Sequence, residues 1–184
     1  MKVKPKERLI NTALELFCQR GFHATGIDTI LSQSKVAKTT MYRHFRSKDE
    51  LILAALKKRD EDFRIWLSQT IQAAEVPPAD SLLLVFDLHK KWADQVDFNG
   101  CAFVKAAAEF PLANSPIHAF CAQHKTLMTQ YLQTLTESTK TKDPVSVAEQ
   151  LMILLDGATV IAQVTGQSSA FEQAKQAAKQ LITR

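Results

Sequence analysis

The stretch from residue 25 to residue 48, TGIDTILSQSKVAKTTMYRHFRSK, constrains the fold of this chain more than any other part. Its first half places Ile27, Ile30 and Leu31 three and four residues apart, which puts them on one face of a helix. A turn follows at Ser34 and Lys35, and after it comes a second apolar set: Val36, Met41 and Phe45. The pattern therefore predicts two short helices joined by a tight turn.

The second of these helices carries many side chains that donate hydrogen bonds. Its outward positions are Lys38, Thr39, Thr40, Tyr42, Arg43, His44 and Lys48. Such donors suit phosphate oxygens and the edges of bases. Plainer interpretations stay open for three of them, because Tyr42 can pack against the first helix and His44 and Lys48 can be ordinary solvated residues. Met41 and Phe45 are expected in the core.

Charge is unevenly distributed along the chain. Residues 1 to 60 hold 13 Lys and Arg against 6 Asp and Glu, whereas the remainder holds 10 against 13. Cations gathered on one surface release counterions from nucleic acid, so a basic head on an acidic body points the head toward a polyanion. The alternative is a solvated basic face.

Composition favours a soluble, mostly helical protein. Apolar residues make up 46% of the 184 residues, with only 5 Gly and 6 Pro. No apolar run approaches the roughly 20 residues of a membrane-spanning helix, and the start, MKVKPKER, lacks the apolar core of a signal peptide. We therefore expect a cytoplasmic location. Three cysteines (Cys18, Cys101 and Cys121) without metal-ligand spacing predict neither a disulfide framework nor a zinc site, and we expect no cofactor.

Helical periodicity and helix stop signals predict an all-α fold of about nine helices and no strand. The expected helices run from about 6 to 20, 25 to 34 and 38 to 45, then from a Ser47–Glu50 capping box past Ile71, and then over 82–96, 101–110, 116–138, 144–165 and about 169–181. Residues 1–48 are predicted to form the basic head of the protein and residues 49–184 its helical body. The fourth helix belongs to both parts, which makes it a candidate lever. The last two helices, from about 144 to 183, resemble half of an intersubunit four-helix bundle.

In the order of its motifs the chain resembles the DNA-binding domain of the TetR family of transcriptional regulators. The resemblance covers about residues 6–52 and rests on a helix ending at Arg20-Gly21-Phe22, on Thr25 before the second helix, and on Val36 to Phe45 followed by Lys48. It implies that residues 1–48 form a helix-turn-helix DNA-binding domain whose third helix reads DNA, and that residues 49–184 form a helical regulatory and dimerisation domain. The chain departs from the family pattern at two positions that affect how this helix approaches DNA. Many relatives have a serine where this chain has Ala37, and a glycine where it has Thr39.

The resemblance also implies a role for each polar residue of the stretch. Thr25 would cap the second helix and meet a phosphate through its hydroxyl or its amide, and Lys48 would clamp another phosphate. Lys38, Thr39 and Thr40 would face base edges. Tyr42 and His44 would contact the phosphate backbone, and Arg43 would read a guanine or a phosphate. His23, in the preceding turn, is interpreted as a solvated loop residue.

Family members commonly bind a small molecule among the middle helices, and this binding separates the two heads of the dimer from successive major grooves. The candidate ligand-binding residues are Phe63, Trp66, Phe86, His89, Trp92, Cys101, Phe103, Phe110, His118 and Phe120. A mostly apolar pocket with few polar groups is typical of a ligand site. For each aromatic residue, a place in the ordinary core is the alternative, and for His89 and His118 a place on the surface.

Cys101 lies at a predicted helix start, where the helix dipole favours a thiolate. It is therefore either a sensor of electrophiles or oxidants, or a small buried hydrophobic residue. Cys18 and Cys121 are expected in the core.

These features favour a ligand-responsive homodimeric regulator, most simply a repressor, that binds a pseudopalindromic double-stranded DNA operator and is released by a small-molecule effector. A small all-α hydrolase using Cys101 and His118 is a second hypothesis, but no phosphate-binding loop, HExxH motif or nucleophile elbow supports an enzyme. A basic adaptor that binds RNA or acidic proteins is a third.

Overall fold

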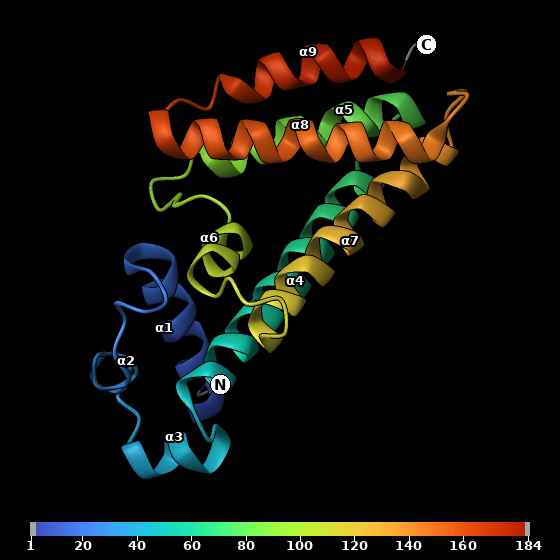
Figure 1. Cartoon of the computed structure of the whole chain (residues 1–184). Coiled ribbons are helices and arrows are strands. Elements are labelled where there is room, and N and C mark those ends of the chain that lie inside the picture. The colour runs from blue at the N-terminus through green and yellow to red at the C-terminus, as the bar shows by residue number, and fades with distance from the viewer. Residues whose placement is uncertain (1–2, 183–184) are drawn as a thin grey trace. The chain divides into compact units, whose positions relative to one another are not determined.

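The computed structural model describes residues 3–182, and within that range the chain forms nine α-helices and no strand (Figure 1). The helices are α1 (Pro5–Arg20), α2 (Ile27–Ser34), α3 (Lys38–His44), α4 (Lys48–Ala73), α5 (Pro78–Ala93), α6 (Ala102–Glu109), α7 (Pro116–Glu137), α8 (Pro144–Thr165) and α9 (Ala170–Ile182). The all-α prediction is confirmed over the described residues. The helices fall into two compact units. The first unit comprises residues 1–62 with 102–123, and the second unit comprises 63–101 with 124–184.

In the first unit, α1 packs against α2 and α3. Its largest fully buried side chains are Leu9, Leu16, Phe17, Phe22, Ile30, Met41, Leu51, Ile52 and Leu56. Gly21 ends α1 with a φ of 91°, a left-handed conformation that favours glycine, and its N–H donates to the Phe17 carbonyl. The chain then folds back, so that the Phe22 ring stacks on Phe17 with centroids 5.1 Å apart. The predicted stop of the first helix is thereby confirmed.

Helix starts in this unit agree with the sequence in two cases and differ in one. Ala37 caps α3 without a side-chain hydrogen bond, as its missing hydroxyl predicts. At α4, the Glu50 N–H donates to Ser47 Oγ at 3.2 Å, and the Glu50 carboxylate accepts from the Arg46 N–H at 2.7 Å. The prediction that Thr25 caps α2 is wrong, because Gly26 is the N-cap residue.

The second unit is built around α5, α8 and α9, with α9 lying along both α5 and α8 (Figure 1). Its core includes Leu82, Val85, Phe86, Leu132, Leu151, Leu155, Phe171 and Ala178. The Asp143 carboxylate caps α8 by accepting from the Ser146 N–H at 3.1 Å, and Gly166 ends α8 in the left-handed region, with a φ of 70°. Small residues at Ala158, Ala162, Ala174 and Ala178 are buried where these helices pack.

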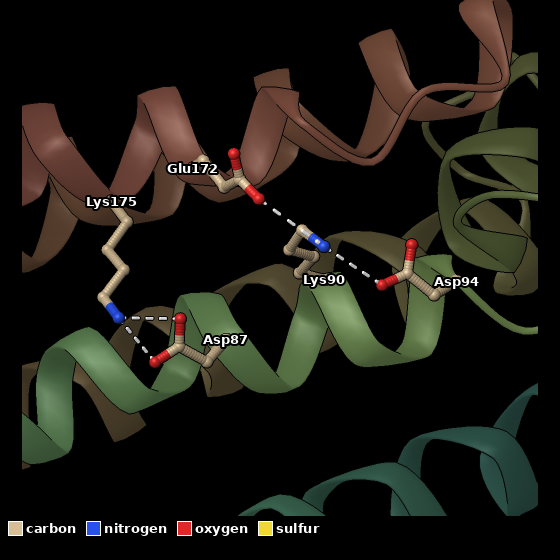
Figure 2. A network of polar contacts seen from close by, with 5 residues as sticks. All are labelled: Asp87, Lys90, Asp94, Glu172 and Lys175. Carbon is tan, nitrogen blue, oxygen red and sulfur yellow. Dashed lines mark hydrogen bonds and ion pairs between the residues drawn. The ribbon is translucent and has the colours of Figure 1, made fainter.

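Ion pairs also join α5 to α9 on the surface of the second unit (Figure 2). Lys175 Nζ lies 2.7 and 2.6 Å from the two carboxylate oxygens of Asp87. Lys90 lies between Asp94 of its own helix end, at 3.2 Å, and Glu172 of α9, at 3.6 Å. Hydrogen bonds from Ser168 and Lys90 lower the pKa of Asp94, and the bond to Asp94 raises the pKa of Lys90. These exposed pairs fix how α9 is aligned along α5 more than they add stability.

Helix α8 corrects the expectation that no segment is long and apolar enough to cross a membrane. It has 22 residues and includes an 18-residue window with a mean hydropathy of 1.5. This is weak evidence for a membrane span, since the core helix of a soluble protein has the same length and composition. One face of α8 is buried at Val147, Leu151, Leu155 and Ala158.

Candidate nucleic-acid interface

Helix α3 presents a polar face that is fixed by two buried anchors. Met41 is fully buried and Phe45, just after the helix, is 4% exposed. The opposite positions, Lys38, Thr39, Tyr42, Arg43 and His44, are all exposed, and Thr40 is half-buried. Tyr42 is 45% exposed, which argues against its packing into the first helix. The predicted donors therefore share one solvent-facing surface, as a DNA-reading helix requires.

Lys38 has an acidic neighbour on the preceding helix. Its Nζ lies 3.7 Å from Asp28 Oδ1, and both side chains are largely exposed. An exposed pair of this kind stabilises a fold little. It does, however, place a carboxylate next to a residue predicted to read base edges.

Thr25 does not reach this surface. Its side chain is 1% exposed, and its hydroxyl donates to the Gly21 carbonyl at 2.7 Å and to the Leu16 carbonyl at 3.3 Å. The expectation that this hydroxyl meets a phosphate is wrong, because the hydroxyl ties the turn before α2 to the end of α1. A threonine before a helix suits either arrangement, and here the bonds to α1 prevail.

Lys48 is half-buried and bound within the first unit. Its Nζ donates to the His23 carbonyl at 3.1 Å, and burial lowers its pKa, against the opposing effects of Asp49 and Glu109. One of its three N–H donors is thus used by the turn between α1 and α2. The predicted phosphate contact of Lys48 stays a prediction.

The same turn is held by Glu109, at the end of α6. One carboxylate oxygen accepts from the Phe22 N–H at 2.8 Å and the other from the His23 N–H at 2.6 Å. His23 is exposed in its loop, as predicted, and its ring nitrogen Nε2 also lies 2.9 Å from the Glu109 carbonyl, a contact that the sequence did not predict. We call these three bonds, together with the Lys48 bond to His23, the turn clamp.

Two further contacts bring α6 to the start of the helix-turn-helix. Lys105 Nζ donates to the Cys18 carbonyl at 2.7 Å, and the Phe110 ring lies 4.7 Å from the His23 ring and 6.4 Å from Phe22. No motif predicted these contacts or those of Glu109, because the partners lie far apart in the sequence: Glu109 is 86 and 87 residues from His23 and Phe22, and Lys105 is 87 residues from Cys18. A bidentate carboxylate on two consecutive N–H groups is a strong, directional tie.

The predicted ligand-binding residues divide between the two units. In the second unit, Phe63 is the centre of an aromatic cluster, with ring centroids 5.5 Å from Trp66, 5.4 Å from His89 and 5.8 Å from Trp92. Phe98 joins it at 4.9 Å from Trp92, and Phe171 at 6.2 Å from His89. Neither of these two was predicted as a ligand residue, although both are aromatic. Phe86 is fully buried in the core.

Four other predicted residues, Phe103, Phe110, His118 and Phe120, belong to the first unit. Phe103 and Phe120 have ring centroids 6.4 Å apart, and Lys57 Nζ lies 6.0 Å from the Phe120 ring. His118 Nδ1 lies 2.8 Å from the Phe110 carbonyl. Phe110 itself packs on the turn clamp. The predicted set is therefore divided between the two units.

His89 is the polar member of the aromatic cluster. Burial lowers its pKa to about 4, although the bond to Val85 and the charge of Asp156 act in the opposite direction. Its Nδ1 lies 2.7 Å from the Val85 carbonyl, so Nδ1 carries the proton of the neutral ring and Nε2 is an acceptor. The cluster thus offers aromatic surface and one neutral acceptor.

Cys101 lies immediately before α6, at the helix start that the sequence predicted. Its side chain is 9% exposed. Its Sγ lies 3.8 Å from Lys125 Nζ, which is also 2.6 Å from Asp156 Oδ1. The thiol therefore has a cationic neighbour. Among the described residues, no group of three or more His, Cys, Asp or Glu side chains is placed to hold a metal ion.

Comparison with known proteins identifies the helix-turn-helix. Residues 9–55 match the family described as bacterial regulatory proteins, tetR family. The solved structure of SCO4454, a TetR-family transcriptional regulator from Streptomyces coelicolor, aligns with a TM-score of 0.91 and 27% identity over 97% of this chain and 94% of that one. The chain belongs to the TetR family of transcriptional regulators.

Two Escherichia coli proteins extend the comparison. The transcriptional regulator YjdC is 21% identical over 83% of this chain and 80% of its own length. The transcriptional repressor NemR is 29% identical over 56% of this chain and 53% of its own length. Both relatives are named as helix-turn-helix regulators, and this chain is likewise a helix-turn-helix transcriptional regulator that binds DNA. Proteins of this family are normally not enzymes.

The turn clamp leads to a first prediction. Glu109→Gln removes one of the two acceptor oxygens and leaves a backbone N–H without its partner, at a cost of about 1 to 3 kcal/mol. Urea denaturation followed by circular dichroism is expected to give a lower midpoint. Hydrogen exchange is expected to be faster at the Phe22 and His23 amides. The matched control is Glu61→Gln, at an exposed position of α4 in the same unit. A wild-type midpoint for Glu109→Gln contradicts the clamp.

The buried imidazole leads to a second prediction. The unfolded chain takes up a proton on His89 near pH 6.5, whereas the folded protein resists it until about pH 4. Stability is therefore complete above pH 6.5 and falls as the pH drops toward 4, by at most about 1.4 kcal/mol per pH unit from this group. In His89→Gln, denaturation at a series of pH values is expected to give a shallower slope over that range. An equal slope in the variant contradicts the assignment.

Proposed function

We propose that the protein is a homodimeric, ligand-responsive repressor that binds a pseudopalindromic DNA operator and leaves it when a small molecule binds. The observation that carries this proposal is the exposed row of donors on α3, held in place by buried Met41 and Phe45. We infer a cytoplasmic location, since this is where such a regulator meets its operator. The name of the relative NemR, a repressor, supports the sign of regulation.

Within this proposal, the exposed residues of α3 divide by position. Lys38, Thr39 and Thr40 begin the helix and are assigned to base edges, where lysine reaches guanine acceptors and threonine methyls touch thymine. Tyr42 and His44 are assigned to phosphates, and Arg43 to a guanine or a phosphate. Lys48 is assigned to a phosphate through the donors that the turn clamp leaves available. For Thr25, only its backbone N–H at the start of α2 remains a candidate contact.

The dimer interface is assigned to α8 and α9, residues 144–183, as a four-helix bundle with the same pair from a second copy. Support comes from the apolar residues that α8 exposes in the single chain: Val145, Ile153, Val160, Ile161 and Val164. Shallow, mostly apolar grooves lie along the same face, lined by Ile153, Leu154, Ala177 and Leu181 and by Met152, Gly157 and Ile161. An apolar helix face of this extent needs a partner.

The functional division is proposed at residue 48, with the DNA-binding domain at 1–48 and the regulatory domain at 49–184. Helix α4 starts at Lys48 and continues to Ala73, so it carries any displacement from the effector side directly into the turn clamp. Helix α6 reaches the same turn through Glu109. A small shift of these helices moves α3 away from its groove.

The effector site is assigned to the predicted aromatic residues. The strongest candidates are Phe63, Trp66, His89 and Trp92, whose rings contact one another around a single neutral acceptor. Phe86 and Cys101 are assigned to the same site in the second unit, whereas Phe103, Phe110, His118 and Phe120 form a separate candidate group in the first unit. A flat, mostly apolar effector with one hydrogen-bond donor fits this chemistry.

Operator binding gives the third prediction. Full-length protein is expected to select a palindromic consensus from a random duplex library. Thr40→Val alters the base preferred at one position of each half-site, whereas Tyr42→Phe weakens binding to all duplexes alike, because it removes a phosphate contact. Fluorescence anisotropy at several salt concentrations measures both effects. Selection of no consensus by the wild type, or of the same consensus by Thr40→Val, argues against the proposal.

A second candidate function is a thiol-based sensor of electrophiles or oxidants. The proximity of Lys125 Nζ to Cys101 Sγ favours it, since a neighbouring cation stabilises a thiolate. Electrophile addition at this sulfur would displace Lys125 from between Cys101 and Asp156. The packing of the segment before α6, which leads to the turn clamp, would change with it.

Cysteine substitution gives the fourth prediction. In Cys101→Ser, release of operator DNA by N-ethylmaleimide is expected to be lost, while affinity without the reagent is unchanged. Cys121→Ser is the matched control, at a buried cysteine of α7. Release that persists in Cys101→Ser removes the thiol-sensor candidate and leaves the small-molecule effector.

A further inference from the structure

Asp28 is the only acidic residue between residues 25 and 46, the stretch that forms the DNA-facing surface. It lies in the first turn of α2, and its side chain is 89% exposed. A carboxylate at this place repels approaching phosphates and lowers affinity for every DNA sequence. Its contribution to the fold is also small, because it forms only an exposed ion pair. Neither general DNA affinity nor stability of the fold therefore explains a carboxylate at this position.

The partner of Asp28 is Lys38, the first residue of α3, with Nζ and Oδ1 3.7 Å apart. Lysine is a flexible point charge that phosphates attract readily. Asp28 competes with the phosphates for this ammonium group and keeps it at the start of α3. The ammonium retains free donors, and the second carboxylate oxygen of Asp28 remains an acceptor. The pair therefore presents a donor and an acceptor side by side.

We propose that Asp28 is a specificity-determining residue that reads, together with Lys38, one G·C base pair in each half-site. Lys38 donates to guanine N7 and O6, and Asp28 accepts from the cytosine N4 amino group. In the major groove a G·C pair offers two acceptors followed by one donor, which matches the order of the two side chains. An A·T pair places its donor between two acceptors, so the thymine O4 repels the carboxylate. This inference rests on the proposed role of α3.

Removing the carboxylate has two separable effects. Lys38 becomes free to bind a phosphate, so affinity for random DNA rises and its logarithmic dependence on salt steepens by about 0.9 per protomer. Preference for the G·C pair falls by about 5- to 150-fold, the range that one good base contact provides. A residue that only stabilises the first turn of α2 produces neither effect.

The test uses full-length protein and a random duplex library, with the wild type, Asp28→Ala, Lys38→Ala and the double variant. Anisotropy titrations over a range of salt concentrations then compare the selected operator with a duplex altered at the G·C position. The matched control is Asp62→Ala, which removes a carboxylate from another exposed Lys–Asp pair of the first unit, where Lys58 Nζ lies 2.8 Å from Asp62. Circular dichroism verifies folding.

The expected result is loss of preference at the same base pair in both single variants. The double variant is expected to lose no more than either single variant, because the two residues act as a unit. Additive losses, losses at different base pairs, an unchanged consensus in Asp28→Ala, or an equal effect of Asp62→Ala overturns the inference. Selection of no consensus by the wild type instead overturns the proposed operator binding itself, and the inference with it.

Discussion

The arrangement of the DNA-binding end depends on one carboxylate, that of Glu109, bound to two consecutive backbone N–H groups of the turn after α1. A turn of this kind exposes amides that need acceptors, and a bidentate anion satisfies two of them in a fixed direction. Gly21 makes the approach possible, because a Cβ at this residue would lie 3.0 Å from Glu109 Oε1. Lys48 holds the same turn through the His23 carbonyl. Helices α4 and α6 therefore both bind the turn between α1 and α2.

This tie matters because α3 has few constraints of its own. It has seven residues, and its cap, Ala37, offers no side-chain hydrogen bond. Helices this short are marginal in isolation, so α3 depends on the burial of Met41 and Phe45 against the rest of the first unit. The packing of Met41 and Phe45 thus positions the donors of α3. The turn before α2 positions the helices against which these two residues pack. Exposed polar residues and buried anchors together make a rigid surface, as the proposed reading of DNA requires.

Much of the fold could be predicted because its signals are local. Gly21 and Gly166 end α1 and α8 as predicted, because glycine readily takes a positive φ. Pro116 and Pro144 begin α7 and α8, where proline suits the first helical position. The candidate site was less predictable. The hydroxyl of Thr25 suited a helix cap equally well, and only the nearby α1 carbonyls decided its use. The Glu109 contacts join residues more than 80 positions apart, which no spacing reveals. Aromatic composition likewise could not separate Phe63 and Trp92 from Phe103 and Phe120.

The proposed regulation requires two identical heads that the proposed α8–α9 interface holds at one separation. Half-sites read by such a dimer lie about 34 to 36 Å apart, one turn of DNA. The most direct measurement is a titration of the selected operator against versions with about 5 base pairs, half a turn, inserted at its centre. The account predicts that the insertion reduces affinity to that of random duplex, since one head then faces the wrong side of the DNA. Equal affinity for both duplexes would contradict it.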